Sequence, residues 1–150
     1  METEQPPHTI KQLVQWMKKR CCNFESYSID GNFIYEGFGL EEALHGYVWY
    51  YTERGQRTSI TFFASEQEAV AHAYHQIAGD KWASAHCVGL TDKQPEAQEL
   101  AGRLEALGIA YWQDVIPGFY GLHRPAYRTF VAGCDIRRAE FLKSQYYHKP

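Results

Sequence analysis

Histidines and cysteines are the side chains of this chain whose spacing could support metal or thiol chemistry. His72 and His75 are three residues apart, and His86 directly precedes Cys87. A zinc site needs three or four such ligands that converge, with further groups holding them in place. A histidine spacing of three also lacks the tighter pattern of known zinc motifs. We therefore expect His72 and His75 to be exposed helical side chains, and we predict no metal site.

A cysteine beside a histidine could also act as a nucleophile. The sequence holds four cysteines, at Cys21, Cys22, Cys87 and Cys134. Two of them are adjacent, which is not a zinc-finger spacing, and free cysteines usually behave as small buried hydrophobes. The first twenty residues contain no apolar run, so we expect no signal peptide or membrane segment. The cysteines are then expected to be reduced thiols in the cytoplasm.

Carboxylates gather at Glu41-Glu42 and again at Glu66 and Glu68. The second group fits a helix cap, and the first is typical of a solvated face. The chain has no Gly-rich phosphate loop, no serine nucleophile elbow and no HExxH. We therefore predict no catalytic residue and no cofactor, and we expect the protein not to be an enzyme.

Composition is consistent with one soluble domain that contacts other proteins. The chain has 150 residues and a formal net charge of −3, so it lacks the basic stripe of a nucleic-acid-binding domain. Aromatic residues make up 15% of the chain, and tyrosine and tryptophan are enriched at protein interfaces as well as in cores. We predict a single domain over 1–150, with frayed ends at 1–7 and 147–150.

The most strongly patterned stretch is 46–77. Its β-branched and aromatic residues around Val48 and again over 58–63 predict two strands, joined by a turn at Gly55. Ser65 and Glu68 have capping-box spacing, and apolar residues then recur at 3-4-3 intervals. The stretch therefore predicts a strand, a turn, a second strand and a capped helix.

The rest of the chain gives further elements. Thr9 should cap a first helix, and Gly31 marks a hairpin within 26–36. The segment 40–45 is either a helical turn or a loop, and 82–88 is either helix or buried strand. The remaining expectations are a helix capped by Thr91 or Asp92, a strand over 109–115, a loop over 116–125, a strand over 126–132 and a final helix capped by Asp135.

Two segments thus share the order strand, turn, strand, helix: 46–78 and 109–146. This repeated order predicts an α+β fold with a single, mainly antiparallel sheet, two ββα-like units and about four helices packed on the sheet.

Four runs of the sequence carry a resemblance to a known family: YYTERG at 50–55, FASEQEA at 63–69, LGIAY at 107–111 and YRTFVAGCDI at 127–136. They resemble the immunity proteins of bacterial polymorphic toxin systems, including the cytoplasmic immunity proteins of contact-dependent growth inhibition. The resemblance implies a non-enzymatic, cytoplasmic inhibitor that binds one cognate toxin domain, usually a nuclease, and blocks its active site or substrate surface.

Such an inhibitor needs aromatic anchors and acidic groups that complement a basic toxin. The candidate partner-binding residues are Glu36, Glu41, Glu42, Glu53, Arg54, Phe119 and Tyr120. The alternative is a small ligand-binding domain or enzyme with an aromatic and histidine-lined pocket. A pocket in which His86, Cys87 and a carboxylate converge would favour that alternative.

Overall fold

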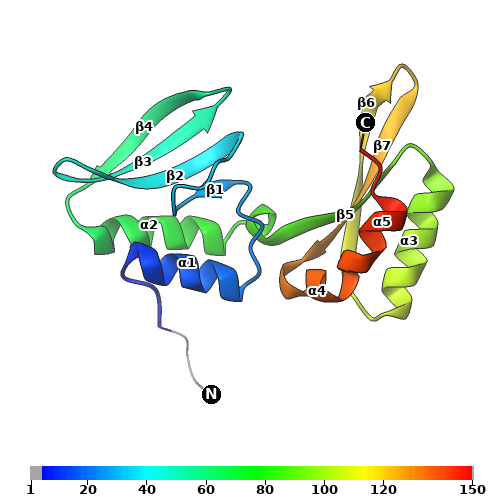
Figure 1. The fold of residues 1–150 in the computed structure, drawn as a ribbon, viewed down its shortest axis with the longest axis horizontal. Helices are drawn as coiled ribbons and strands as arrows, with labels where there is room; N and C mark the ends of the chain where they lie inside the picture. Colours follow the sequence, from blue (N-terminus) through cyan, green and yellow to red (C-terminus); the bar gives the residue numbers. More distant parts are fainter. Residues whose placement is uncertain (1–4, 150) are drawn as a thin grey trace. The chain divides into compact units, whose positions relative to one another are not determined.

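The computed structural model describes residues 5–149, which form two compact units that divide between Ser84 and Ala85 (Figure 1). The first unit holds a four-stranded sheet and the second a three-stranded sheet. The α+β class is therefore confirmed, whereas the prediction of a single sheet is wrong. The prediction that the chain is one domain stays a prediction.

The first unit is built from two helices, four strands and a short 3₁₀ helix. These are α1 (Ile10–Lys19), β1 (Tyr27–Ser28), β2 (Glu36–Ala43), β3 (Gly46–Glu53), β4 (Gln56–Phe63), α2 (Glu66–Ala78) and η1 (Lys81–Ser84). The strand order is β1-β2-β3-β4. Both helices lie against one face of the sheet, so the opposite face carries no helix of this unit (Figure 1).

Alternation along the central strand decides which side chains are buried between sheet and helices. Trp49 of β3 is 1% exposed and belongs to the core together with Leu40 of β2, Leu13 and Met17 of α1, and Val70 of α2. Neighbouring residues of a strand point to opposite faces. Val48 and Tyr50 therefore lie on the face away from the helices, which we call the outer face.

The predicted strand–turn–strand–helix stretch is confirmed. Arg54 and Gly55 have φ of +53° and +78°, the positive pair that a tight two-residue hairpin turn requires. Ser65 caps α2, because its hydroxyl accepts a hydrogen bond from the Glu68 backbone N–H at 3.2 Å. Thr9 caps α1 in the same way through the N–H of Gln12.

Two expectations for the first unit are wrong. The hairpin within 26–36 does not form, because β1 pairs parallel to β2, with Tyr27 opposite Phe38. Gly31 does adopt a positive φ of +69°, but it does so in a loop that carries the chain across to β2. The segment 40–45 is neither helical turn nor loop, since Leu40 and its neighbours pair with β3 as part of β2.

The second unit has a sheet in the order β5-β7-β6. Its core joins α3 and α5 to the sheet through Val88, Leu100, Leu104, Val131 and Tyr146. Its elements are β5 (Ala85–Thr91), α3 (Gln94–Ala106), β6 (Tyr111–Gly121), β7 (Arg124–Ala132), η2 (Gly133–Asp135), α4 (Ile136–Ala139), η3 (Glu140–Leu142) and α5 (Lys143–Tyr146).

For residues 82–88 the sequence left helix and buried strand as alternatives. In the structure a 3₁₀ helix ends at Ser84 and strand β5 begins at Ala85. The predicted loop over 116–125 is instead the paired end of the β6–β7 hairpin, with a register shift between Ile116 and Gly121 that absorbs Pro117. The final helix is divided into short α and 3₁₀ segments, and Asp135 makes no side-chain cap bond.

The predicted frayed ends fall partly outside the described residues, at 1–4 and 150. Within the described residues, Tyr147 pairs with Leu90 of β5, and the His148 N–H donates to the Leu90 carbonyl at 2.8 Å.

Cys22 and Cys87 are free thiols, as expected. Cys21 takes part in a disulfide, as does Cys134, so the prediction of a reduced thiol is wrong for each of them.

Candidate functional site

The four predicted contact glutamates lie on β2 and β3, but they do not form one acidic patch. Glu36 and Glu53 are opposite each other in the register of the two strands. The Tyr51 hydroxyl donates to the Glu36 carboxylate at 2.7 Å. This hydrogen bond is the main reason that the pKa of Tyr51 rises to about 12, with desolvation second and the charges of Glu36 and Glu53 adding to it. Glu36 therefore has a structural partner already.

The other two glutamates sit nearer the opposite end of the strands, and they face opposite sides of the sheet. Glu42 is opposite Tyr47, on the face that packs against the helices. Glu41 is on the outer face, where it pairs with Arg57 of β4 at 2.7 Å. Of the four predicted glutamates, only Glu41 belongs to the uncovered outer face.

An arginine bridge crosses the outer face above Tyr50. The Arg57 guanidinium lies 3.9 Å from the centre of the Tyr50 ring and reaches over β3 to Glu41 on β2. The Tyr50 ring itself lies over Gly39, where a Cβ atom would come within 2.1 Å of it. A glycine at this position is what lets the ring lie flat on the sheet. Hydrogen bonding to Glu41 raises the pKa of Arg57 and keeps it charged.

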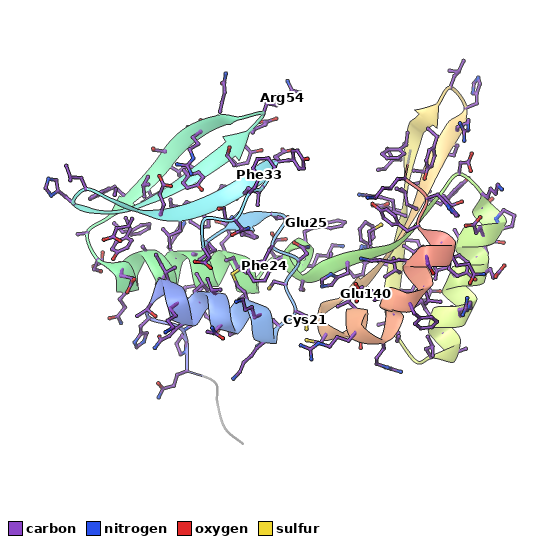
Figure 2. The ribbon with its side chains drawn as sticks, in the orientation of Figure 1. Cys21, Phe24, Glu25, Phe33, Arg54 and Glu140 are labelled. Carbon is purple, nitrogen blue, oxygen red and sulfur yellow. The ribbon has the colours of Figure 1, made fainter. Side chains whose placement is uncertain are left out.

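Beside this bridge the structure has a groove of about 470 Å³ within the first unit. One wall is the loop between β1 and β2, and the other is the tip of the β3–β4 hairpin. Figure 2 shows Phe33 on that loop and Arg54 at that tip. The groove is lined by side chains that include Phe33, Tyr35, Glu41, Tyr50, Arg54 and Arg57. Sequence reasoning singled out Glu41 and Arg54 among these and missed the rest.

Two rings of the loop are unusually open to solvent. Phe33 is 75% exposed and Tyr35 is 84% exposed, and the rings meet edge to face with centres 5.0 Å apart. Ile34 between them is buried and anchors the loop. In the sequence, Phe33, Ile34 and Tyr35 are a continuous apolar run, so no local pattern distinguishes the two exposed rings from the buried Ile34.

Further along the outer face the surface becomes apolar. Phe62 of β4 pairs with Val48 of β3, and Ile60 is the unpaired residue at the register shift between the two strands. Ile60 and Phe62 are 53% and 56% exposed. Contiguous exposed apolar side chains are a usual mark of interaction surfaces. The outer face thus has an apolar half and an aromatic half that also carries two arginines.

The predicted aromatic contacts Phe119 and Tyr120 belong to the second unit and lie in β6, not in a loop. Their rings meet edge to face at 5.0 Å. Phe119 is 39% exposed, whereas the Tyr120 hydroxyl donates to the His148 carbonyl at 2.7 Å. Tyr120 therefore helps to hold the C-terminal residues in place.

Around Tyr120 the second unit has a polar cavity of about 750 Å³. Several of its charged groups have partners within the chain. Arg124 makes two hydrogen bonds to Asp92, at 2.8 and 3.0 Å, which lower the pKa of that carboxyl. His148 contacts Glu96, and the Tyr146 hydroxyl donates to Glu99 at 2.6 Å. The contacts of His148 and Tyr146 tie the C-terminal residues to α3, and the Arg124–Asp92 pair joins β7 to the residues before α3.

The residues considered for metal or thiol chemistry do not converge. Residues 5–149 contain no group of three or more histidine, cysteine or carboxylate side chains that could hold a metal ion. His72 is exposed and packs edge to face against the Trp49 ring. His86 and Cys87 are consecutive in β5 and point to opposite faces. The Cys87 thiol donates to the Gly89 carbonyl, and burial raises its pKa, which disfavours the thiolate.

No protein-family model, no curated protein and no solved structure matches this chain. No helix within residues 5–149 is long and apolar enough to cross a membrane. Function must therefore be inferred from the surfaces described above.

Proposed function

We propose that the chain is an immunity protein that binds a cognate toxin domain and neutralises it by covering its active site or substrate surface. A nuclease is the toxin class that the sequence resemblance implies. On this proposal the protein acts in the cytoplasm by protein–protein contact and performs no catalysis itself.

The observation that carries the proposal is the uncovered outer face of the first unit's sheet. It presents exposed Phe33 and Tyr35 beside the Tyr50–Arg57 stack. Tyrosine, tryptophan and arginine are the residue types that contribute most binding energy at protein interfaces. These groups are held by strands and by a buried loop anchor at Ile34, so little ordering is needed on binding.

An upstream gene for a large secreted protein with a toxic C-terminal domain would favour this function, and co-expression of the chain with that domain is the direct test. We expect cells to survive, and we expect the two proteins to elute as one complex in size-exclusion chromatography. If the toxin still kills and no complex elutes, the proposed function is wrong.

A matched pair of variants separates binding from folding. Tyr35→Ala removes an 84% exposed ring from the outer face, and Leu122→Ala removes an 86% exposed side chain from the second unit. Both should leave the circular dichroism spectrum and melting temperature unchanged. We expect Tyr35→Ala to weaken toxin binding at least tenfold, which corresponds to about 1.4 kcal/mol of binding free energy. Leu122→Ala should have little effect on binding.

A ligand-binding or enzymatic function is the second candidate, and the polar cavity of the second unit is the observation that favours it. Against it, Asp92, Glu96, Glu99 and the Tyr120 hydroxyl all have partners within the chain. A ligand there would have to replace those contacts. A thermal-shift screen with small polar metabolites tests this candidate. The candidate requires that a metabolite raise the melting temperature of the unchanged chain and that His148→Ala abolish this rise.

A further inference from the structure

The outer face of the first sheet has a direction along its strands. Val48 and Phe62 pair with each other at the end of β3 and β4 nearest Gly46, and Phe62 is 56% exposed. Arg57 pairs with Thr52 at the other end, just before the turn that carries Arg54. The Arg57 guanidinium reaches back over Tyr50 to Glu41, which is opposite Val48. The turn end of the face therefore carries Arg54, and the Arg57–Glu41 pair lies beside the apolar end.

The cationic end can bind a further anion. Arg54 is exposed, and it makes no ion pair with the described residues 5–149. Arg57 donates to Glu41 from Nη1, and a guanidinium has five N–H groups in all. The Arg57–Glu41 pair is also about half exposed on both sides, at 51% and 46%. Such exposed pairs are weak, so a second carboxylate can share the arginine at little cost.

Resting on the function proposed above, we propose that this face binds one segment of the partner protein, which is apolar along most of its length and carries a carboxylate at one end. The apolar side chains lie over Val48 and Phe62. The carboxylate lies between Arg54 and Arg57, beside the exposed rings of Phe33 and Tyr35. An aspartate or glutamate is the group that fits, because guanidinium groups bind carboxylates in a planar, two-bond geometry.

This assignment reverses the charge expected from the sequence. Glutamates on the chain would have required a basic partner surface, whereas the outer face has two arginines and one glutamate among the groove residues. The contact segment of the partner is therefore acidic at one end, even where the rest of a toxin domain is basic.

The test uses the full chain and a phage-displayed library of random eight-residue peptides as the probe. We expect enriched peptides to contain two or more apolar residues and a terminal Asp or Glu. A synthetic enriched peptide should bind at least tenfold more weakly to Arg54→Glu and to Phe62→Ser. Arg137→Glu and Phe141→Ser change exposed residues of the second unit in the same way and should bind within twofold of the unchanged chain.

Other outcomes would overturn the inference. These are enrichment of basic peptides, no enrichment, equal binding by the outer-face and control variants, or displacement of the peptide by a short single-stranded oligonucleotide, which would indicate a general anion site. Toxin co-expression keeps the two proposals apart. If Arg54→Glu and Phe62→Ser still protect cells as well as the unchanged chain does, this inference fails and the immunity function stands. If the unchanged chain does not protect, the immunity function fails whatever peptides are enriched.

Discussion

Each of the two sheets carries an arginine that lies over an aromatic ring and pairs with a carboxylate, but the two pairs are built differently. In the second unit, Arg128 and Asp114 are direct cross-strand partners joined by two hydrogen bonds, at 2.7 and 2.5 Å. In the first unit, Arg57 spans an intervening strand to reach Glu41 through one bond at 2.7 Å. The first geometry holds neighbouring strands together. The second forms part of a surface.

Exposure supports the same distinction. Arg128 and Asp114 are about one-third exposed, at 31% and 34%, whereas Arg57 and Glu41 are about half exposed. Hydrogen bonding to Asp114 raises the pKa of Arg128, so both arginines stay charged. An ion pair with two bonds and less water has little capacity for a new partner. The more exposed, single-bonded pair is the one that can take part in recognition.

The largest expected loss of stability comes from replacing Gly39, over which the Tyr50 ring lies beneath Arg57. Gly39→Ala places a Cβ atom within 2.1 Å of the Tyr50 ring. The ring must move, and overpacking of this kind typically costs about 1–3 kcal/mol. Urea denaturation followed by tryptophan fluorescence measures the loss.

Gly102→Ala is the matched control for this change. Gly102 lies within α3, and a Cβ atom there meets nothing within 4 Å. Alanine is the better helix former by up to about 1 kcal/mol, so this variant should be more stable than the parent chain. Equal destabilisation by both substitutions would contradict the account of Gly39.

Double-mutant cycles compare the two ion pairs directly. We expect a coupling free energy for Arg128 and Asp114 of about 1.5 kcal/mol, at the low end for hydrogen bonds to charged groups. For Arg57 and Glu41 we expect about 0.2–1 kcal/mol, as for exposed pairs. Alanine variants and chemical denaturation measure both. A stronger coupling for the Arg57 pair would reverse the comparison.

The smallest effect concerns pH. Burial raises the pKa of Cys22 in the first unit to about 11 from 9.0, with the charge of Arg20 opposing part of the rise. A raised folded-state pKa favours folding while the thiol is protonated. This contribution is complete below about pH 9 and is lost as the pH rises towards 11. Cys22→Ala should therefore lose less stability than the parent chain between about pH 8 and 10.5. An identical alkaline loss in the two proteins would show that another group is responsible.

The sequence predicted those elements whose signals are local. Thr9 and Ser65 identify helix starts because their hydroxyls bond to N–H groups three residues away, and Gly55 identifies a turn because few residues tolerate its φ. The β2 strand was missed, because its glycines and paired glutamates have weak strand propensity and pairing with β3 decides its conformation. The division into two sheets was missed for a similar reason, since nothing local reports which strands pair.

The candidate site was predicted only in part. Glu41 and Arg54 were chosen from the sequence and do line the groove. Tyr50 and Arg57 were not, because their contact depends on Gly39 from a third strand. Glu36 and Glu42 face the other side of the sheet, and a one-residue difference in strand position is enough to reverse a side chain.

The pairing of Tyr147 and His148 with Leu90 has a consequence for solubility. β5 is an outer strand, and the open backbone groups of an outer strand are a template on which another chain can add. The last residues of the chain occupy part of that template. Truncation before Tyr147 would uncover the apolar strand and favour aggregation, and a bulky fusion at the C-terminus would strain the same contact. The N-terminus, where the described chain begins at exposed Gln5 ahead of α1, is the safer place for an affinity tag.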